Sequence, residues 1–378
     1  MSDRRIRAGI LLRHLQDPGG ITVYTERVAR HLGLREPDLE CHFLYQTEAG
    51  AEKLAGIPGV HRVLHARSRL GWDQIAIPRY ARRHGLDVLF HGKFAVPFAA
   101  RIPTAIFLPG PEQLMVPHLF RRTDRLLSRL SLPLHVRRAR AVVMLSEAAR
   151  RDLIVATGVE ADRVRVIPPG VDSDLRRATP EQVADLRARL DLPGRFVLFL
   201  GGVTPLKNLR RLLQAFELLS DEPDLSLVLA GFARWRYAKE LAPLREGNLA
   251  RRVRAVGFIA DRDRAALYSA ATCLALPSLY EGFGMPIIEA MACGCPVLTS
   301  DRSGCAEAAG GAAVLTDPTR PEAIAAGLRR IVRDEALHRD LAQRGRAQAA
   351  RYRWEVAGQA IATLLRELAS RPGPEDSP

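Results

Sequence analysis

Short apolar runs alternate with helix-like segments along the whole chain. Each run is rich in leucine and β-branched residues, whereas the segments between the runs repeat apolar residues at helical spacing. Strands that are apolar throughout are typical of parallel sheets covered by helices on both faces. The first series of runs is RAGILL, CHFLY, VHRVL, DVLFH, TAIFL, AVVML and RVRVI, and the second is RFVLFLGG, LSLVLAG, RVRAVG, CLALP and PVLTS. The pattern predicts an α/β protein with two parallel sheets.

The segment VIPPGVD separates the two series, and its two prolines and glycine cannot continue a helix or a central strand. A chain of 378 residues is long for one core and comfortable for two domains of ordinary size. We therefore expect a first domain over residues 1–172 and a second domain over residues 173–352. A closing helix is expected over 353–370, followed by a mobile tail over 371–378.

The composition is that of a soluble globular protein, with 47% hydrophobic and 26% charged residues. The five cysteines are odd in number and lack C-x2-C spacing, so we expect reduced thiols and neither disulfides nor a zinc site. No apolar run approaches the roughly 18 to 20 residues needed to span a bilayer, and the first apolar stretch is too short for a signal peptide. These features predict a cytoplasmic protein.

The net charge of +14 comes mostly from arginine, which suits phosphate-bearing or anionic-lipid partners. Interleaved aromatic and basic residues are missing, so we expect no nucleic-acid partner. Over residues 119–140, Arg121, Arg125 and Arg129 recur at helical spacing beside leucines. Such a helix is either a solvated face or a peripheral contact with the inner face of a membrane.

The segment PSLYEGFGMPIIEAMACGCPVLTS places Glu281 and Glu289 eight positions apart around a glycine-rich helix start. Gly282 and Gly284 let the backbone approach a ligand closely, and Pro286 suits the first helical turn. A helix that starts there directs free N–H groups at an anion or at hydroxyl groups. Ionised carboxylates accept several hydrogen bonds, so the two glutamates can hold hydroxyl pairs of a sugar ligand. The alternative is a buried helix capped by a carboxylate.

In its order of strand, glycine loop, helix and strand, this segment resembles the donor-sugar site of retaining glycosyltransferases of family 4. Glu307 in SGCAEAAGG stands where that family often has a further glutamate, although Ala306 replaces the usual proline. The resemblance covers nearly the whole chain. It implies the GT-B fold, in which two Rossmann-like domains face an interdomain cleft. It also implies that the first domain is the acceptor side, that the closing helix packs back on it, and that the second domain binds the nucleotide sugar.

The resemblance also implies the site residues. Lys207 would stabilise the leaving diphosphate, Glu281 would hold the sugar, and Glu289 would hold the ribose. His91 ends a strand and is a candidate for acceptor binding, with a strand-end histidine bonded to backbone as the alternative. The catalytic candidates are Glu281, Lys207 and His91. At the nucleotide base we expect Gly231, Phe258 and Ile259, in addition to the loop from Phe232 to Trp235. The residues expected to bind the donor are Gly19, Gly20, Lys207, Glu281, Gly282, Phe283, Gly284, Met285, Pro286 and Glu289.

Two positions depart from the family pattern. Leu206 occupies the place of an arginine that usually precedes the lysine, and Arg210 or Arg211 is the candidate substitute. Pro109 and Gly110 stand where many relatives carry His-Asp, so the acceptor side differs from the common arrangement.

The predicted function is transfer of a sugar from a nucleoside-diphosphate sugar, a UDP- or GDP-linked hexose, to an acceptor hydroxyl with retention of configuration. The acceptor would be a sugar, a lipid carrier or a small molecule, in polysaccharide, glycolipid or glycoside biosynthesis. No acidic cluster suggests a metal, and we expect neither a metal nor another cofactor. The alternative is a nucleotide-sugar-binding protein of the same fold without transferase activity.

Overall fold

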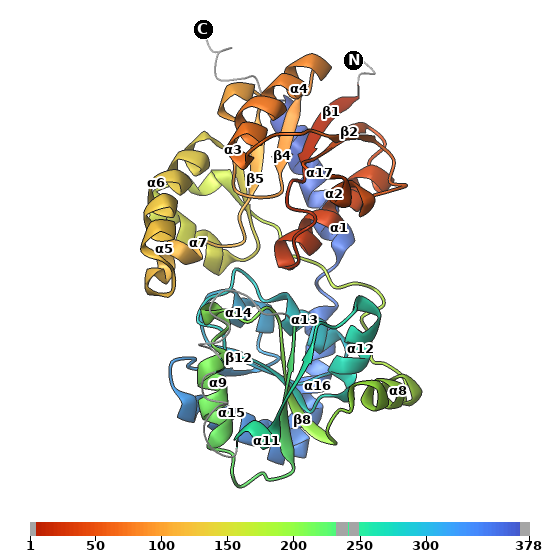
Figure 1. The fold of residues 1–378 in the computed structure, drawn as a ribbon, viewed down its shortest axis with the longest axis vertical. Coiled ribbons are helices and arrows are strands. Elements are labelled where there is room, and N and C mark those ends of the chain that lie inside the picture. The colour runs from red at the N-terminus through yellow and green to blue at the C-terminus, as the bar shows by residue number, and fades with distance from the viewer. Residues whose placement is uncertain (1–4, 232–240, 242–248, 371–378) are drawn as a thin grey trace. The chain divides into compact units, whose positions relative to one another are not determined.

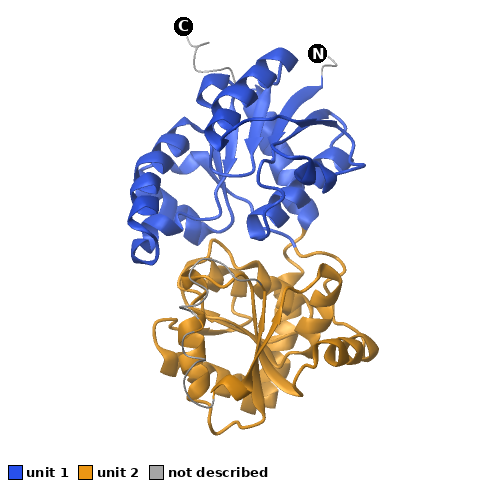
Figure 2. Cartoon of the chain, viewed as in Figure 1, with its two compact units in different colours: residues 1–170, 354–378 blue, residues 171–353 orange. Residues whose placement is uncertain are grey.

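The computed structural model describes residues 5–231, 241 and 249–370 (Figure 1). Contacts between residues divide the chain into two compact units, drawn in different colours in Figure 2. Unit 1 comprises Met1–Gly170 with Trp354–Pro378, and unit 2 comprises Val171–Arg353. The expected tail and the expected loop from Phe232 to Trp235 lie outside the described residues.

Unit 1 is built on a seven-stranded sheet in which every pair of neighbouring strands is parallel. Each of the seven apolar runs of the first series forms one strand, which confirms the α/β prediction. In spatial order the strands are β3 (Val60–Val63), β2 (Leu39–Tyr45), β1 (Ile6–Leu11), β4 (Val88–His91), β5 (Thr104–Phe107), β6 (Ala141–Met144) and β7 (Val164–Val166).

Helices cover this sheet, and the closing helix is one of them. The main helices of unit 1 are α1 (Gly20–Arg35), α2 (Glu48–Glu52), α3 (Arg69–Gly71), α4 (Ile77–His84), α5 (Glu112–Met115), α6 (Arg122–Arg138), α7 (Glu147–Thr157) and α17 (Trp354–Ser370), with a π-helical turn over Trp72–Ala76. Helix α17 packs closely on α1, because a Cβ on Gly358 would lie only 2.2 Å from Cγ of His31. Arg366 then pairs with Glu36 at 2.5 Å and with Asp38 at 2.7 Å.

Unit 2 is built on a six-stranded sheet that is also parallel throughout. In spatial order its strands are β10 (Val253–Gly257), β9 (Leu225–Ala230), β8 (Arg195–Leu200), β11 (Cys273–Leu276), β12 (Val297–Ser300) and β13 (Val314–Thr316). The five runs of the second series form the first five of these, whereas β13 adds a short strand that the apolar pattern did not predict.

Helices also cover the sheet of unit 2. Its helices are α8 (Pro180–Leu190), α9 (Leu209–Glu217), α11 (Leu249–Arg252), α12 (Asp261–Ala270), α13 (Met285–Ala292), α14 (Ser303–Ala309), α15 (Pro321–Arg333) and α16 (Glu335–Ala349). Local sequence explains the start of α8, where Thr179 and Gln182 form a reciprocal capping box, and of α16, where Asp334 accepts from the amide of Leu337.

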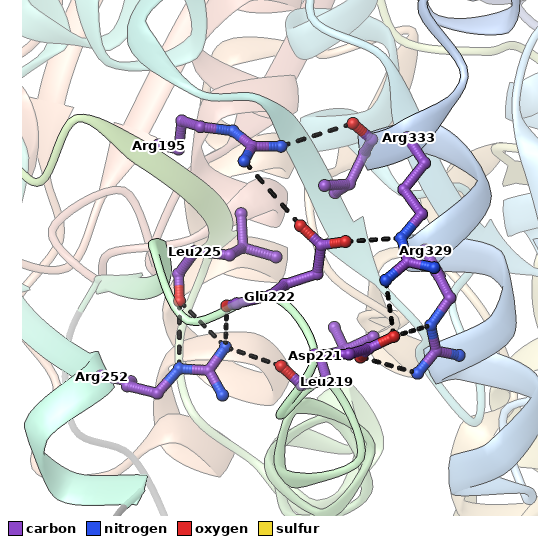
Figure 3. Close-up of polar contacts among 9 residues, drawn as sticks. Arg195, Leu219, Asp221, Glu222, Leu225, Arg252, Arg329 and Arg333 are labelled. Atoms are coloured by element: carbon purple, nitrogen blue, oxygen red, sulfur yellow. Dashed lines mark hydrogen bonds and ion pairs between the residues drawn. The ribbon is translucent and has the colours of Figure 1, made fainter.

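The amino edge of the second sheet carries a cluster of charged residues, shown in Figure 3. We call it the amino-edge arginine cluster; it consists of Arg195, Arg252, Arg329 and Arg333 with Asp221 and Glu222. Arg329 binds both carboxylate oxygens of Asp221 at 3.0 and 3.1 Å. Arg252 donates to the carbonyl oxygens of Leu219, Glu222 and Leu225. These contacts tie α11 and α15 to the loop between α9 and β9.

Candidate functional site

Three loops follow neighbouring strands at the carboxyl edge of the second sheet, after β8, β11 and β12. Strand β8 pairs with β9 on one side and with β11 on the other, so the order of strands reverses between β8 and β11. Ligands of open parallel sheets bind outside the carboxyl ends of the strands at such a switch point. Figure 1 shows α13 and α14 at this end of unit 2 and α11 at the opposite end.

The loop after β8 is held in place by Asn208. This residue has a left-handed backbone with φ of 59°, and its side chain is buried. Its Nδ2 donates to the carbonyl oxygens of Pro277 at 2.9 Å and of Pro318 at 2.6 Å. The amide of Leu279 donates to the carbonyl oxygen of Leu206 at 2.8 Å. The loops that follow β8 and β11 are therefore bonded to each other.

Lys207 and Glu281 meet at this junction. Nζ of Lys207 lies 2.5 Å from Oε1 of Glu281, and the two side chains are 17% and 16% exposed. The hydroxyl of Ser278 donates to the same carboxylate at 2.9 Å. The amide of Glu281 donates to the hydroxyl of Ser303 at 3.2 Å, which joins the loop after β12 to the pair. The structure thus brings together the lysine and the glutamate that the sequence proposes as catalytic candidates.

The glycine loop forms the start of α13 as predicted. Gly284 precedes the helix with φ of 99°, a conformation that favours glycine, and Pro286 lies in the first turn. Met285 is the first helical residue, and Phe283 is buried against Tyr352. The first amide groups of a helix lack helical partners and bind anions or hydroxyl oxygens.

Gly304 lies close to the backbone of Gly282. A Cβ on Gly304 would lie 2.5 Å from the carbonyl oxygen of Gly282, so the loops after β11 and β12 touch through backbone atoms. Ser303, beside it, adopts φ of 55°, which is uncommon for a residue with a side chain. These contacts fix the height of the glycine loop above the sheet.

Glu289 lies on α13 with only 5% of its surface exposed. Nη1 of Arg264 lies 2.9 Å from one carboxylate oxygen, and the phenol of Tyr268 donates to the other at 2.8 Å. Burial raises the pKa of Tyr268 well above its usual value, and the charge of Glu289 raises it further, so the phenol remains protonated. Nη2 of Arg264 lies 3.6 Å from Asp172. Glu289 is thus held by α12.

The residues predicted at the nucleotide base follow β9 and β10 at the same edge of the sheet. Gly231 follows β9 with φ of 131°, and a Cβ there would lie 2.0 Å from the carbonyl oxygen of Gly201, so only glycine fits. Its amide donates to the carbonyl oxygen of Gly257 at 2.7 Å. Phe258 is exposed and Ile259 is buried.

The carboxyl edge of the first sheet holds the remaining predicted residues. Gly19 precedes α1 with φ of 133°, and Gly20 is the first residue of that helix. His91 is fully buried: Nε2 lies 3.0 Å from Asp73, and Nδ1 accepts from the amide of Lys93 at 3.0 Å. Both ring nitrogens are therefore bonded within the unit. The bond from the Lys93 amide corresponds to the alternative of a strand-end histidine bonded to backbone, and the role of His91 in acceptor binding stays a prediction.

The departures from the family pattern are also visible. Arg211 donates to Oδ1 of Asn208 at 3.0 Å, whereas Arg210 is exposed on α9. Arg211 therefore supports the loop that carries Lys207. The residues that sequence reasoning missed are Arg264 and Tyr268, which stand one helical turn apart and hold Glu289, and Ser278 and Ser303, which bind Glu281.

Within the described ranges, no group of three histidine, cysteine, aspartate or glutamate side chains is arranged to hold a metal ion. No helix in the same part of the chain combines the length and the apolar character that crossing a bilayer requires.

Comparisons with known proteins agree with this geometry. The family model "Glycosyltransferase Family 4" matches residues 18–175, and the model "Glycosyl transferases group 1" matches residues 185–348. The O-antigen chain mannosyltransferase B of Escherichia coli is 30% identical over 78% of this chain and 76% of its own. A D-inositol 3-phosphate glycosyltransferase of Xylanimonas cellulosilytica is 28% identical over 94% of this chain and 93% of its own.

Solved structures show the same fold. Anabaena HepE in complex with UDP and glucose superposes with a TM-score of 0.80 over 96% of this chain and 100% of its own, at 24% identity. The glycosyltransferase WaaG superposes with a TM-score of 0.74 over 95% of this chain and 99% of its own, at 18% identity. The two parallel sheets have the GT-B fold of these structures, and the family models and relatives identify a glycosyltransferase that uses nucleotide sugars. The chain belongs to glycosyltransferase family 4, whose members are retaining hexosyltransferases.

Proposed function

We propose that the protein transfers a hexose from a UDP- or GDP-linked donor to an acceptor hydroxyl in polysaccharide, glycolipid or glycoside biosynthesis. The observation that carries the proposal is the contact of Lys207 with Glu281 at the switch point of the second sheet. The mannosyltransferase relative and the likeness to HepE with bound UDP support a nucleotide-linked hexose. In this proposal unit 1 is the acceptor side.

In the proposed reaction, the bond between the anomeric carbon and the diphosphate breaks while a bond to the acceptor oxygen forms on the same face. The leaving diphosphate takes the proton of the acceptor hydroxyl. Lys207 would neutralise the charge that develops on the diphosphate, which is worth several kcal/mol where water is excluded. Glu281 would exchange its ion pair for hydroxyl groups of the sugar. The backbone from Phe283 to Pro286 would bind the remaining oxygens through the N–H groups of Phe283, Gly284 and Met285, since Pro286 has none.

Glu289 would accept hydrogen bonds from the ribose. A carboxylate offers about four lone-pair sites, and Arg264 and Tyr268 each occupy one. Two sites therefore remain for a pair of hydroxyl groups without loss of the existing contacts. The base would lie beside Gly231, Phe258 and Ile259.

A thermal-shift panel of UDP-, GDP-, ADP- and TDP-sugars tests the proposed donor site. We expect one nucleotide class to raise the melting temperature of the wild type, and Glu289→Gln to lose most of that shift. Glutamine keeps a partner for Tyr268, whereas Glu289→Ala would also leave Arg264 buried beside an empty volume. Failure of every nucleotide sugar to stabilise the wild type would refute the proposed donor site.

A separate test concerns metal dependence. We expect sugar transfer measured with and without EDTA to proceed at equal rates.

We also propose peripheral contact with an anionic membrane surface through α6. Leu126, Leu127, Leu130 and Leu134 are between 60% and 66% exposed, although Leu132 of the same helix is buried. The side chains of Arg121, Arg125 and Arg129 are exposed on the same stretch. A basic helix with exposed leucines suits a surface of acidic lipids, where each cation contributes about 1 kcal/mol.

Co-sedimentation with vesicles tests this contact. We expect the protein to bind vesicles containing phosphatidylglycerol and to bind pure phosphatidylcholine poorly. Replacement of Leu126 and Leu130 by serine is expected to weaken binding without lowering the melting temperature, because both side chains are exposed. A matched control replaces the exposed Val155 of α7 by serine. Equal binding to both lipids, or equal effects of the two changes, would reject α6 as the contact.

A further inference from the structure

The carboxyl edge of the first sheet has a switch point of its own. Strand β1 lies between β2 and β4, so the strand order reverses next to β1. His14 follows β1 in the turn that leads to α1, and 4% of its surface is exposed. A Cβ on Gly92, just after β4, would lie 2.8 Å from Cε1 of His14. The imidazole therefore lies over the junction of β1 and β4, where a ligand of this sheet is expected.

The hydrogen bonds around His14 determine its tautomer. Nε2 lies 3.0 Å from Oγ1 of Thr25 on α1. The hydroxyl of Thr25 has one proton, which it donates to the carbonyl oxygen of Ile21 at 2.8 Å or of Thr22 at 3.2 Å. With that proton on a carbonyl oxygen, the Thr25 oxygen is the acceptor for Nε2–H of His14. We assign His14 this tautomer, in which Nε2 carries the proton and Nδ1 presents a lone pair.

Nδ1 of His14 is buried and has no hydrogen-bond partner among the described residues. Burial is the largest cause that lowers the pKa of His14, and together with the nearby charges of His91, Lys93 and Arg13 it brings that pKa to about 3, so the ring is neutral at physiological pH. A buried acceptor left unpaired is costly, and buried polar groups in native proteins are normally paired. The group that completes this site is therefore a hydrogen-bond donor.

The need for a donor at Nδ1 favours a hydroxyl group over an ionised acid. The guanidinium of Arg13 is paired with the carboxylate of Asp73, which also accepts from His91. Its charge is thus compensated within the unit. A phosphate or carboxylate would have to compete with Asp73, and neither is able to donate to Nδ1 when ionised. A sugar or polyol hydroxyl meets the requirement.

We propose that Nδ1 of His14 accepts a hydrogen bond from a hydroxyl group of the acceptor substrate and thereby positions it. The proposal rests on the proposed transfer function, and it assigns the acceptor to the class of hydroxylated, sugar-like molecules. Because Nδ1 is covered, access requires a displacement of the turn from Leu12 to Asp17, which ends next to the glycine pair Gly19 and Gly20.

Imidazole nitrogen NMR of the full chain tests the contact directly. Protein labelled with ¹⁵N-histidine is titrated with methyl α-D-mannopyranoside and with myo-inositol in the presence of the stabilising nucleotide. We expect His14 to show the Nε2–H tautomer and its Nδ1 resonance to shift toward that of a hydrogen-bonded nitrogen with at least one of the two probes. His14→Gln identifies the resonance. An Nδ1 resonance that neither probe moves would overturn the proposal.

Two variants separate positioning from folding. Glutamine at position 14 places an amide near Nε2 and keeps the bond to Thr25, but it has no acceptor at Nδ1. Asparagine places an oxygen near Nδ1 and loses Thr25. For transfer to the responding probe, we expect His14→Gln to raise KM for the acceptor about tenfold and His14→Asn to recover part of that loss. The KM for the nucleotide sugar and the rate of its hydrolysis by water should not change.

Equal acceptor KM values for the wild type and His14→Gln would overturn the role of His14 while the transferase function stands. Loss of nucleotide-sugar binding and hydrolysis in the wild type itself would instead refute the proposed function. The two failures are therefore distinguishable.

Discussion

The second sheet carries ion pairs at both of its ends, and the two ends differ in what surrounds the charges. In the amino-edge arginine cluster, the guanidinium groups bind both carboxylates and the carbonyl oxygens at the end of α9 and in the following loop. At the carboxyl edge, the pair of Lys207 and Glu281 lies beside a glycine loop at the start of α13.

The difference separates a stabilising cluster from a binding site. Arg252 and Arg329 bond to main-chain oxygens, so a ligand would have to replace several contacts at once. Glu281 has Lys207 and Ser278 as side-chain partners. A diphosphate is also an anion, so it can take the place of the Glu281 carboxylate as the partner of Lys207. Substitution of Lys207 should therefore lower activity more than stability, and substitution in the amino-edge arginine cluster should lower stability more than activity.

Lys207→Ala should give the largest effect on activity. We expect kcat to fall about 10²- to 10³-fold, because a cation aimed at developing charge contributes about that much. The melting temperature should fall by less than it does for Arg264→Leu, because the Glu281 carboxylate is more exposed than that of Glu289 and keeps the hydrogen bond from Ser278. Steady-state kinetics and calorimetry measure the two quantities. The control is Arg333→Ala, which removes a cation from the amino edge; a comparable loss of kcat there would break the comparison.

Arg264→Leu should give the largest effect on stability. It leaves the carboxylate of Glu289 buried without a cation, and breaking such a pair costs about 3 kcal/mol. Urea denaturation measures the change in free energy of unfolding. The double variant Arg264→Leu, Glu289→Leu should recover much of the loss, because it removes the unpaired charge. If the double variant is instead less stable than Arg264→Leu alone, the loss of the ion pair is not the cause of the destabilisation.

Arg252→Met tests the amino edge for stability alone. The change keeps an apolar stem over Phe216 but removes the N–H groups that bind the carbonyl oxygens of Leu219, Glu222 and Leu225. We expect a loss of about 1–2 kcal/mol in the free energy of unfolding, with kcat and both KM values unchanged. A fall in kcat at constant stability would place a functional group at the amino edge.

Much of this fold is predictable from the sequence because strands buried on both faces are apolar throughout. Twelve of the thirteen strands coincide with an apolar run. The exception, Val314–Thr316, has three residues and alternates buried with exposed positions, so periodicity carries no signal there. The order of the strands in each sheet depends on packing between distant segments and is not contained in the local pattern.

The candidate site likewise contains residues that the local sequence predicts and residues that only packing brings together. Glu281, the glycine loop and Glu289 stand in one segment, and their spacing predicts their common position. Arg264 and Tyr268 lie on α12 in a stretch, DRDRAALYSA, that resembles a solvated helix face. Their contact with Glu289 arises only when α12 packs beside α13. The contact of His91 with Asp73, which is distant in sequence, likewise arises only in the folded unit and could not be predicted from the strand end alone.

Asp221→Asn should give the smallest effect, visible only in its dependence on pH. The hydrogen bond from Arg329 is the main cause that lowers the pKa of Asp221 below its ordinary value of about 3.9. Because the folded-state pKa is the lower one, the contribution to stability is complete above the unfolded pKa and is lost as pH falls through the folded pKa.

We therefore expect Asp221→Asn to be slightly less stable than the wild type at pH 7, and the difference to shrink when urea midpoints are measured at pH 3. The carboxylate is substantially exposed, so 1 M salt should also reduce the difference. Asp301→Asn, which affects an exposed aspartate paired with Arg302 at the carboxyl edge, is the matched control for salt. If the wild type and Asp221→Asn differ in stability by the same amount at both pH values, Asp221 acts through packing and not through its charge. The amino-edge arginine cluster would then owe its stability to the hydrogen bonds of Arg252 and Arg329 to main-chain oxygens.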